Sequence, residues 1–193
     1  MSVQDIQTLR KETGAGIVAV KKALDEAGGD IEKARSELRK QGMSVAMKKG
    51  DRDANDGKVV SYLHPGDKIG VLLVLNCETD FVAQTQEFQQ LGRDIAMHIA
   101  AMSPQFVART DVPADVANAE GSVYRAQMEQ ESKPADVIEK IIEGKMEKFY
   151  QSVVLLEQAF IKDTDKTIQQ CIEEVILKLG EKITVGEFTR YEI

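Results

Sequence analysis

The sequence predicts an α+β protein: a bundle of three short N-terminal helices, a linker, and a core in which helices pack on a three-stranded antiparallel sheet. Three observations predict this class. Apolar residues first recur at helical spacing, the pattern then changes to two strands joined by a tight turn, and helical spacing returns before a last strand. We therefore divide the chain into an N-terminal module (1–43), a linker (44–57) and a core domain (58–193).

Capping residues and glycines mark the helices of the N-terminal module. Ser2 can cap a first helix, which Gly14-Ala15-Gly16 ends, and a second helix runs from about residue 17 to 27. Asp30 can cap a third helix. We expect that helix to end at Gly42, because a left-handed residue, most often glycine, closes many helices.

A linker and a hairpin follow. The stretch 48–56 is rich in charge and has no large apolar residue, which is typical of a solvated linker. Residues 58–63 and 69–77 are predicted strands, joined by the turn His64-Pro65-Gly66-Asp67. The last predicted strand, 183–191, can return to this hairpin as the third strand of the sheet.

Four helices are predicted between the hairpin and the last strand. The first has apolar residues spaced along 88–99 and ends at Ser103-Pro104. A weakly amphipathic helix covers about 113–130, and Pro134 opens the next. The strongest helical stripe runs over 168–179 and stops at a glycine.

The composition excludes several classes of protein. A net charge of −7 and only 5% aromatic residues make direct binding of nucleic acid unfavourable, because each phosphate contact needs a cation. The longest apolar run, 71–75, is too short to cross a bilayer, and residues 1–13 do not resemble a signal peptide. Cys77 and Cys171 suit a reducing compartment as free thiols. We expect a cytoplasmic protein without a membrane partner.

The sequence contains no recognisable set of catalytic or metal-binding residues. His64 and His98 are the only histidines, and neither has a partner at metal-ligand spacing. No phosphate-binding loop is present. Residues 51–57 resemble the start of a calcium loop, but the glycine comes one position late and Tyr62 occupies the place of the bidentate carboxylate. We expect neither a metal nor a cofactor, and no enzymatic activity.

One connection carries an unusual aromatic residue. Residues 76–83 leave the long strand and precede a helix that starts near Thr85, and Phe81 lies there beside Asp80. Either Phe81 folds back onto the sheet as a hydrophobic staple, or Asp80 and Phe81 form a wedge that enters a partner. Sequence physics alone favours the staple, because large apolar side chains are usually covered.

Two other positions allow similar alternatives. The pair Ile17-Val18, at the start of the second helix, is either a core staple or an exposed apolar contact. His98 lies on the flank of a helix's apolar face, a position typical of a half-buried, hydrogen-bonded histidine.

Five segments, in order along the chain, resemble the elongation factor Ts family over essentially the whole length: 9–16 followed by 21–24, then 76–83, 98–100, 144–150 and 155–158. The resemblance implies a guanine-nucleotide exchange factor without a cofactor. It also implies a ubiquitin-associated-like N-terminal bundle that docks on the GTPase domain of elongation factor Tu. Ala159 departs from the family pattern, which often has proline at this position. This departure concerns only the local geometry of the loop.

The resemblance also assigns roles to single residues. Thr79, Asp80, Phe81 and Val82 match the segment that intrudes near the partner's magnesium and nucleotide site. Ile17 and Val18 match an apolar docking pair, and His98 matches a position that lines the contact surface of the core. The chain has room for a single half-core. The short form in the family associates as a dimer, so we expect a homodimer formed through the sheets and a two-to-two assembly with elongation factor Tu.

Two further classes of function are kept as alternatives. A structural adaptor would use the N-terminal bundle to bind a helical or ubiquitin-like partner without changing nucleotide affinity, and it would assign no role to Asp80 and Phe81. An enzyme is the third alternative, but the sequence lacks any convergent set of acid, base or metal-binding residues.

Overall fold

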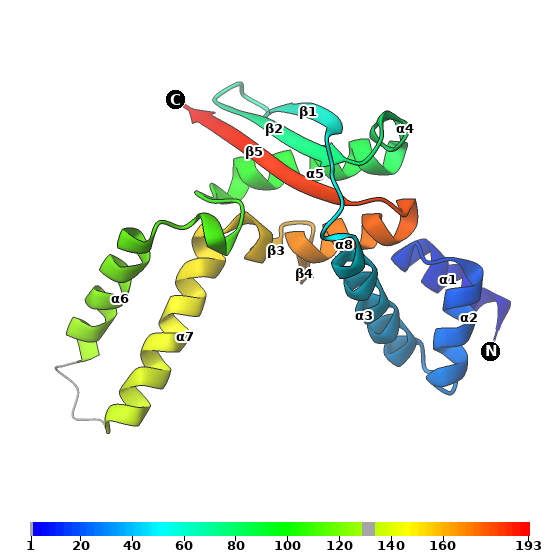
Figure 1. Ribbon diagram of the computed structural model, residues 1–193, viewed down its shortest axis with the longest axis horizontal. Helices are drawn as coiled ribbons and strands as arrows, with labels where there is room; N and C mark the ends of the chain where they lie inside the picture. The colour runs from blue at the N-terminus through cyan, green and yellow to red at the C-terminus, as the bar shows by residue number, and fades with distance from the viewer. Residues whose placement is uncertain (1, 129–133) are drawn as a thin grey trace. The chain divides into compact units, whose positions relative to one another are not determined.

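The computed structural model describes residues 2–128 and 134–193 (Figure 1). The chain forms two compact units, Met1–Ala100 with Gln169–Ile193, and Ala101–Ile168. The first unit combines three N-terminal helices with a three-stranded antiparallel sheet and its helices, which confirms the predicted α+β class. Within the described residues, no helix has both the length and the apolar character needed to cross a membrane.

Two of the three N-terminal helices begin at the capping residues that the sequence predicts. The three helices are α1 (Val3–Thr13), α2 (Ile17–Glu26) and α3 (Ile31–Lys49). The Ser2 hydroxyl accepts a hydrogen bond from Asp5 N at 3.0 Å, and the Asp5 carboxylate accepts one from Ser2 N at 2.8 Å, which completes a capping box. The Asp30 carboxylate accepts a bond from Lys33 N at 3.1 Å at the start of α3. Both predicted caps are confirmed.

These three helices share one small apolar core, and a helix from the end of the chain contributes to it. Leu177 of α8 (Ile168–Leu179) packs against the cluster. The buried members of the cluster are Ile6, Leu9, Ala15, Val20, Ala23, Leu24, Ala34 and Leu38. The bundle is therefore supported by a segment that lies well over a hundred residues away in the sequence.

The predicted end of the third helix at Gly42 was wrong. Helix α3 continues to Lys49, so residues 44–49 of the predicted linker are helical. Gly42 is buried inside the helix, and a Cβ there would lie 3.8 Å from both the Glu173 carbonyl oxygen and Leu177 Cδ2. A distant packing partner therefore outweighs the local helix-ending preference of glycine. The division into module, linker and core stays a prediction.

The sheet consists of β1 (Asp56–Leu63), β2 (Ile69–Cys77) and β5 (Ile183–Glu192) in the order β1-β2-β5. Both neighbouring pairs are antiparallel, so the last strand returns to the hairpin as predicted and lies beside β2. The long, nearly all-apolar β2 is the central strand, which is the position that a continuous apolar run favours.

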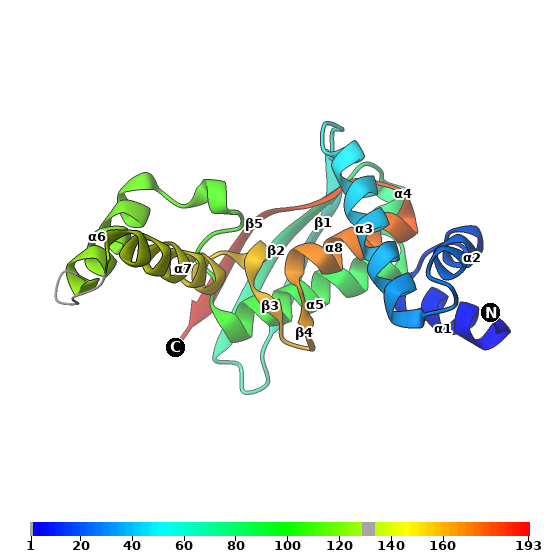
Figure 2. The same ribbon diagram turned by 90° about the horizontal axis from the view of Figure 1, so that it is seen from below.

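Helix α5 (Gln86–Met102) covers one face of the sheet (Figure 2). Leu73 and Leu75 of β2 are fully buried on this inner face. Gly92 of α5 lies directly over the strands, and a Cβ at this position would come within 2.7 Å of Val60 Cγ2. The helix can approach the sheet this closely because Gly92 has no side chain.

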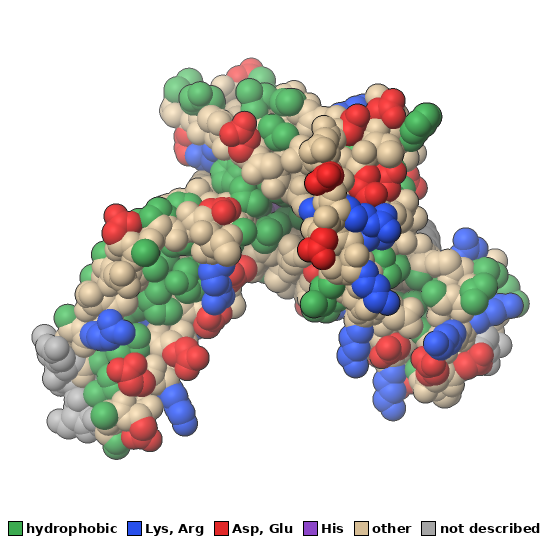
Figure 3. Space-filling model, viewed as in Figure 1, with side chains coloured by type: hydrophobic (Ala, Val, Ile, Leu, Met, Phe, Trp, Pro, Cys, Tyr) green, Lys and Arg blue, Asp and Glu red, His purple; other side chains and the backbone are tan. Residues whose placement is uncertain are grey.

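The opposite, outer face of the sheet carries exposed apolar side chains. Val59, Leu63, Leu72 and Tyr191 are 69%, 61%, 50% and 70% exposed. The strand register places them on one face, because Leu63 and Tyr191 both flank Gly70, and residues directly opposite in a sheet share a face. Hydrophobic side chains gather over these strands in Figure 3. An apolar face of this kind is a candidate contact surface.

The second unit is mainly a helical hairpin with short elements at its base. The predicted helix over 113–130 is α6, which is described as far as Met128, and the predicted end of this helix lies outside the described residues. Pro134 is the N-cap of α7, as predicted. The short elements were not predicted, because pieces of two to five residues have no measurable periodicity. The elements of this unit are η1 (Arg109–Asp111), α6 (Ala114–Met128), α7 (Ala135–Val153), η2 (Leu155–Glu157), β3 (Ala159–Phe160) and β4 (Asp163–Thr167).

Arg109 ties three of these elements together. Its guanidinium donates to Glu157 at 2.7 and 2.6 Å and to Glu147 at 2.8 and 2.7 Å, and it lies 4.3 Å from the centre of the Tyr150 ring. These hydrogen bonds, led by those to Glu157, raise the pKa of Arg109, while Arg109 lowers the pKa of Glu147. This cluster stabilises the base of the hairpin, and its cation is already paired with two carboxylates.

Candidate protein-binding site

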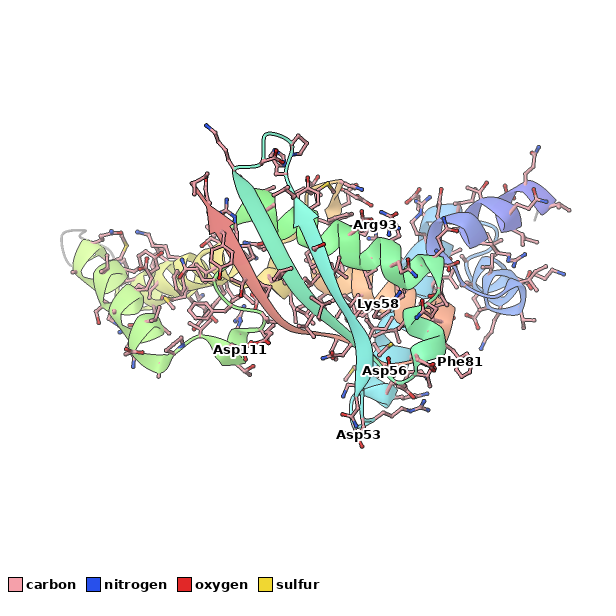
Figure 4. All side chains as sticks on the ribbon, turned by 90° about the horizontal axis from the view of Figure 1, so that it is seen from above. Asp53, Asp56, Lys58, Phe81, Arg93 and Asp111 are labelled. Atoms are coloured by element: carbon pink, nitrogen blue, oxygen red, sulfur yellow. The ribbon has the colours of Figure 1, made fainter. Side chains whose placement is uncertain are left out.

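Phe81 projects into solvent at the end of the central strand. After β2 the chain turns through Glu78 and Thr79 into a single helical turn, α4 (Asp80–Ala83). Phe81 is 81% exposed, whereas the next residue, Val82, is only 8% exposed. Figure 4 shows the labelled Phe81 side chain on α4, directed away from the sheet. The alternative in which Phe81 folds back onto the sheet is wrong.

The turn that carries Phe81 is held from within. The Thr79 hydroxyl caps α4 by accepting a bond from Val82 N at 3.4 Å, and the Thr79 carbonyl accepts one from Ala83 N at 3.2 Å. The Cys77 thiol also donates to the Thr79 carbonyl at 3.1 Å. Val82 and Ala83 supply the apolar anchor. Local bonds and burial together direct Phe81 outward.

A second set of contacts reaches the same turn from the distant loop before β5. Thr79 donates from its backbone N to Glu181 Oε2 at 3.0 Å and from its hydroxyl to Glu181 Oε1 at 2.8 Å. The Glu78 carboxylate accepts from Lys182 N at 2.6 Å and from Arg52 Nη1 at 3.2 Å. Sequence reasoning missed Glu181 and Lys182. Their only sequence signal was an acid next to a base directly before a predicted strand.

The charge states around the turn follow from these bonds. The backbone N–H of Lys182, and after it Arg52, lowers the pKa of Glu78, so this carboxylate is ionised at neutral pH. Burial, and after it the negative charges of Glu181 and Asp56, raises the pKa of the Cys77 thiol. Cys77 is therefore protonated and acts as a buried hydrogen-bond donor instead of a nucleophile.

The segment offers a partner an apolar ring next to a carboxylate. Asp80 is exposed beside Phe81, and Asp56 lies close to the same end of the sheet in Figure 4. Among the described residues, no group of three or more His, Cys, Asp and Glu side chains is placed to hold a metal ion. An exposed phenylalanine on a hydrogen-bonded turn, flanked by an acid, is suited to inserting into a pocket of another protein.

Comparison with known proteins places the chain in a family. The family model described as "Elongation factor TS" matches residues 6–193. The elongation factor Ts of Fervidobacterium nodosum is 54% identical over all 193 residues, and the match covers 98% of that protein. Those of Geobacter metallireducens and Thermosipho melanesiensis are each 51% identical over the whole chain, with 89% and 98% of their lengths covered. The chain belongs to the elongation factor Ts family.

Membership of the elongation factor Ts family confirms the resemblance and makes the chain a translation elongation factor. The remaining residues to which that resemblance assigned roles lie on other elements. Ile17 and Val18 are the first two residues of α2 and are 46% and 78% exposed. The buried residues of the same helix are Val20, Ala23 and Leu24, whereas Val18 is an exposed apolar residue.

His98 lies in the interior of the protein, on α5. Its side chain is fully buried on α5, between the buried Ile95 and Ile99 in sequence, where we expected a half-buried ring. In the described chain, every buried side-chain nitrogen or oxygen has a hydrogen-bond partner, so the cost of burying the imidazole is offset. The role of His98 in contacting a partner stays a prediction.

Proposed function

We propose that the chain binds the GTPase domain of elongation factor Tu and promotes release of GDP, so that GTP can bind during translation elongation. The observation that supports this most is Phe81, 81% exposed on a turn that is bonded from two sides and lies beside an exposed acid. Phe81 leaves a large apolar ring in water, and burial of that ring against a partner would be favourable. Its placement is understandable if a partner covers it.

The proposed mechanism involves no covalent step. A bound magnesium ion and a phosphate-binding backbone hold GDP in a GTPase, and both depend on the position of neighbouring helices. Phe81 would enter between such helices, while Asp80 would compete for polar groups that order the ion. By thermodynamic reciprocity, a protein that binds the empty GTPase more tightly must weaken nucleotide binding by the same factor. The chain thus acts by binding and not as an enzyme.

The hydrogen-bonded turn that carries Phe81 favours this role. Because the backbone of this turn is hydrogen-bonded before binding, less loop-ordering entropy has to be lost when Phe81 inserts. Ile17 and Val18, exposed at the start of α2, supply a second apolar contact in this proposal. The N-terminal module would then dock on the GTPase domain while Phe81 acts on the nucleotide site.

We further propose that a second copy of the chain covers the outer face of the sheet. Antiparallel sheets commonly have one solvated face, and that face is then polar. Here it carries four exposed apolar side chains, Val59, Leu63, Leu72 and Tyr191. A homodimer formed through the sheets would cover them symmetrically and would place two copies of elongation factor Tu on one dimer. Because translation elongation is a cytoplasmic process, we expect this assembly there, without direct nucleic-acid contacts from an acidic chain.

Stopped-flow release of a fluorescent GDP from elongation factor Tu tests the exchange function. The native chain should accelerate release strongly, and Phe81→Ala should lose about tenfold or more of this acceleration, since buried aromatic anchors carry a large share of binding energy. Met47→Ala is the matched control, because Met47 is 80% exposed on α3. This variant should behave like the native chain.

The other outcomes separate the alternatives. Acceleration that survives Phe81→Ala would keep the function but move its mechanism to Ile17, Val18 or His98. Binding to elongation factor Tu without any acceleration would favour a structural adaptor.

A further inference from the structure

Hydrogen bonds that involve side chains connect the two chain segments just beyond the point where the pairing of β2 with β5 ends. The last backbone pair of these strands is Cys77 with Ile183. Immediately beyond it, Thr79 makes its two hydrogen bonds to the Glu181 carboxylate, and Glu78 accepts the bond from Lys182 N. These three bonds join the turn before Phe81 to the turn between α8 and β5, although more than a hundred residues separate the two turns in the sequence.

The same distal turn is bonded to the end of α3. Lys182 Nζ donates to the carbonyl oxygens of Gly50 and Arg52, each at 2.7 Å. The ammonium group of Lys49 contacts the carbonyl oxygen of Gly180. Arg52 in turn donates to Glu78 at 3.2 Å. The segment that follows the N-terminal helices is thus connected through residues 180–182 to the base of the Phe81 turn.

The residues at the base of the Phe81 turn are partly buried, whereas its tip is exposed. The Glu78 side chain is only 20% exposed, and Thr79, Glu181 and Lys182 are partly buried. Phe81, in contrast, is 81% exposed. Charge-assisted bonds of this kind are about twice as strong as neutral ones, and removing one partner leaves a poorly solvated donor unsatisfied. Glu181 therefore restrains the base of α4 without touching its tip.

We propose that Glu181 is a positioning residue that holds Phe81 in the orientation needed for nucleotide exchange, and that Lys182 connects this restraint to the end of α3. The inference rests on the proposed exchange function. Glu181 acts through Thr79 and need not contact the partner. Through hydrogen bonds, Lys182 connects the Phe81 turn to the segment that follows α3. This segment continues from the N-terminal helices, which carry Ile17 and Val18.

A positioning role has a defined kinetic signature. If the turn loosens, Phe81 occupies the productive orientation for a smaller fraction of the time, and the step that requires this orientation slows in proportion. The maximal rate of GDP release at saturating concentration of the chain should fall. The concentration that gives half of this rate should change little, because Ile17 and Val18 are untouched.

The test compares Glu181→Ala, Glu181→Gln and Lys182→Met with the native chain in the GDP-release assay. Glu181→Ala should lower the maximal rate about tenfold, with the half-saturating concentration within about twofold, if the productive orientation becomes tenfold rarer. Glu181→Gln can still accept from Thr79 N and bond to the Thr79 hydroxyl, so it should restore most of the rate. Lys182→Met should cause a smaller loss in the same direction. Glu143→Ala, on the exposed face of α7, is the matched control.

Amide hydrogen exchange of residues 79–84 gives a second measurement that does not depend on activity. These amides should exchange faster in Glu181→Ala and return towards native rates in Glu181→Gln, while the amides of α5 stay unchanged. General unfolding would instead accelerate exchange throughout the core, which distinguishes a poorly folded variant from a loosened turn.

The outcomes separate this proposal from the function on which it rests. If the native chain accelerates release and Phe81→Ala does not, yet Glu181→Ala matches the native chain, the positioning role is overturned and the exchange function stands. An unchanged Lys182→Met would overturn only the connection to α3. If the native chain itself fails to accelerate release, the exchange function fails and the positioning role fails with it.

Discussion

Neighbouring residues at the end of β2 have opposite environments, and this contrast defines the site. Thr79 caps the helical turn and Val82 anchors it, while Asp80 and Phe81 between them face solvent. The sequence identified all four residues as a unit through their family resemblance. Sequence physics alone favoured a covered Phe81. A helix of four residues is too short for the sequence pattern to predict which of its residues faces solvent.

The ion pair at Glu78 makes the stability of this region depend on pH. Its backbone bond from Lys182 and its contact with Arg52 lower the pKa of Glu78 from the ordinary value of 4.5. A lowered pKa stabilises the folded chain above the ordinary value, and this contribution disappears as the pH falls through the folded-state value. Glu78→Gln should therefore reduce the free energy of unfolding at neutral pH, and its difference from the native chain should shrink below about pH 4.5.

Urea unfolding at a series of pH values checks the Glu78 prediction. Glu143→Gln, which removes an exposed carboxylate on α7, provides the baseline. A difference between Glu78→Gln and the native chain that stayed constant down to about pH 3 would show that ionisation of Glu78 does not contribute.

At the scale of helices and strands, local signals were sufficient where the element is defined by its own residues. The capping box at Ser2 and the cap at Asp30 each depend on contacts three residues apart, and both helices begin where predicted. Strand β2 was predicted with the bounds that the structure shows. Gly42 is the exception, because the helix around it is continued by packing against α8, which lies far away in the sequence.

The start of the hairpin depends on a glycine. Gly57 has φ = +146°, and a Cβ at this position would lie 2.1 Å from the backbone carbonyl oxygen of Leu75. Gly57→Ala should reduce the free energy of unfolding by about 3 kcal/mol, because the side chain both strains the backbone and pushes β1 away from β2. Thermal or urea unfolding measures this loss.

Gly66, in the β1–β2 turn, separates the two causes. It also has a positive φ, +97°, but a Cβ there would meet no atom within 4 Å. Gly66→Ala should therefore cost only the backbone strain, about 1–2 kcal/mol. If both substitutions cost the same, the close approach of the two strands at Gly57 would not be important for stability.

For the molecule as a whole, the outer face of the sheet is the feature with the largest consequence. Leu72 lies on the central strand of this face and is 50% exposed. If a second chain covers the face, Leu72→Glu would bury a charge in the interface and should convert the dimer into a monomer. Light scattering at micromolar concentration should then give the mass of one chain, 21.4 kDa, in place of twice that value.

Met47→Glu is the matched control for the dimer. Met47 is 80% exposed on α3, so the same charge placed there should leave the association unchanged. A native chain that scattered as a monomer at the same concentration would contradict the proposed dimer directly. Equal dissociation by both variants would place the interface elsewhere.

The sequence by itself determined the α+β class, the strands of the sheet, most of the helices, and the family through ordered motifs such as residues 76–83. These properties depend on residues that are close together in the chain. Only the tertiary structure decided that β5 lies beside β2, that α3 continues past Gly42, and that Phe81 is exposed over a base held by Glu181. Each of these depends on contacts between distant segments, whose free energy arises only when the chain folds and brings them together.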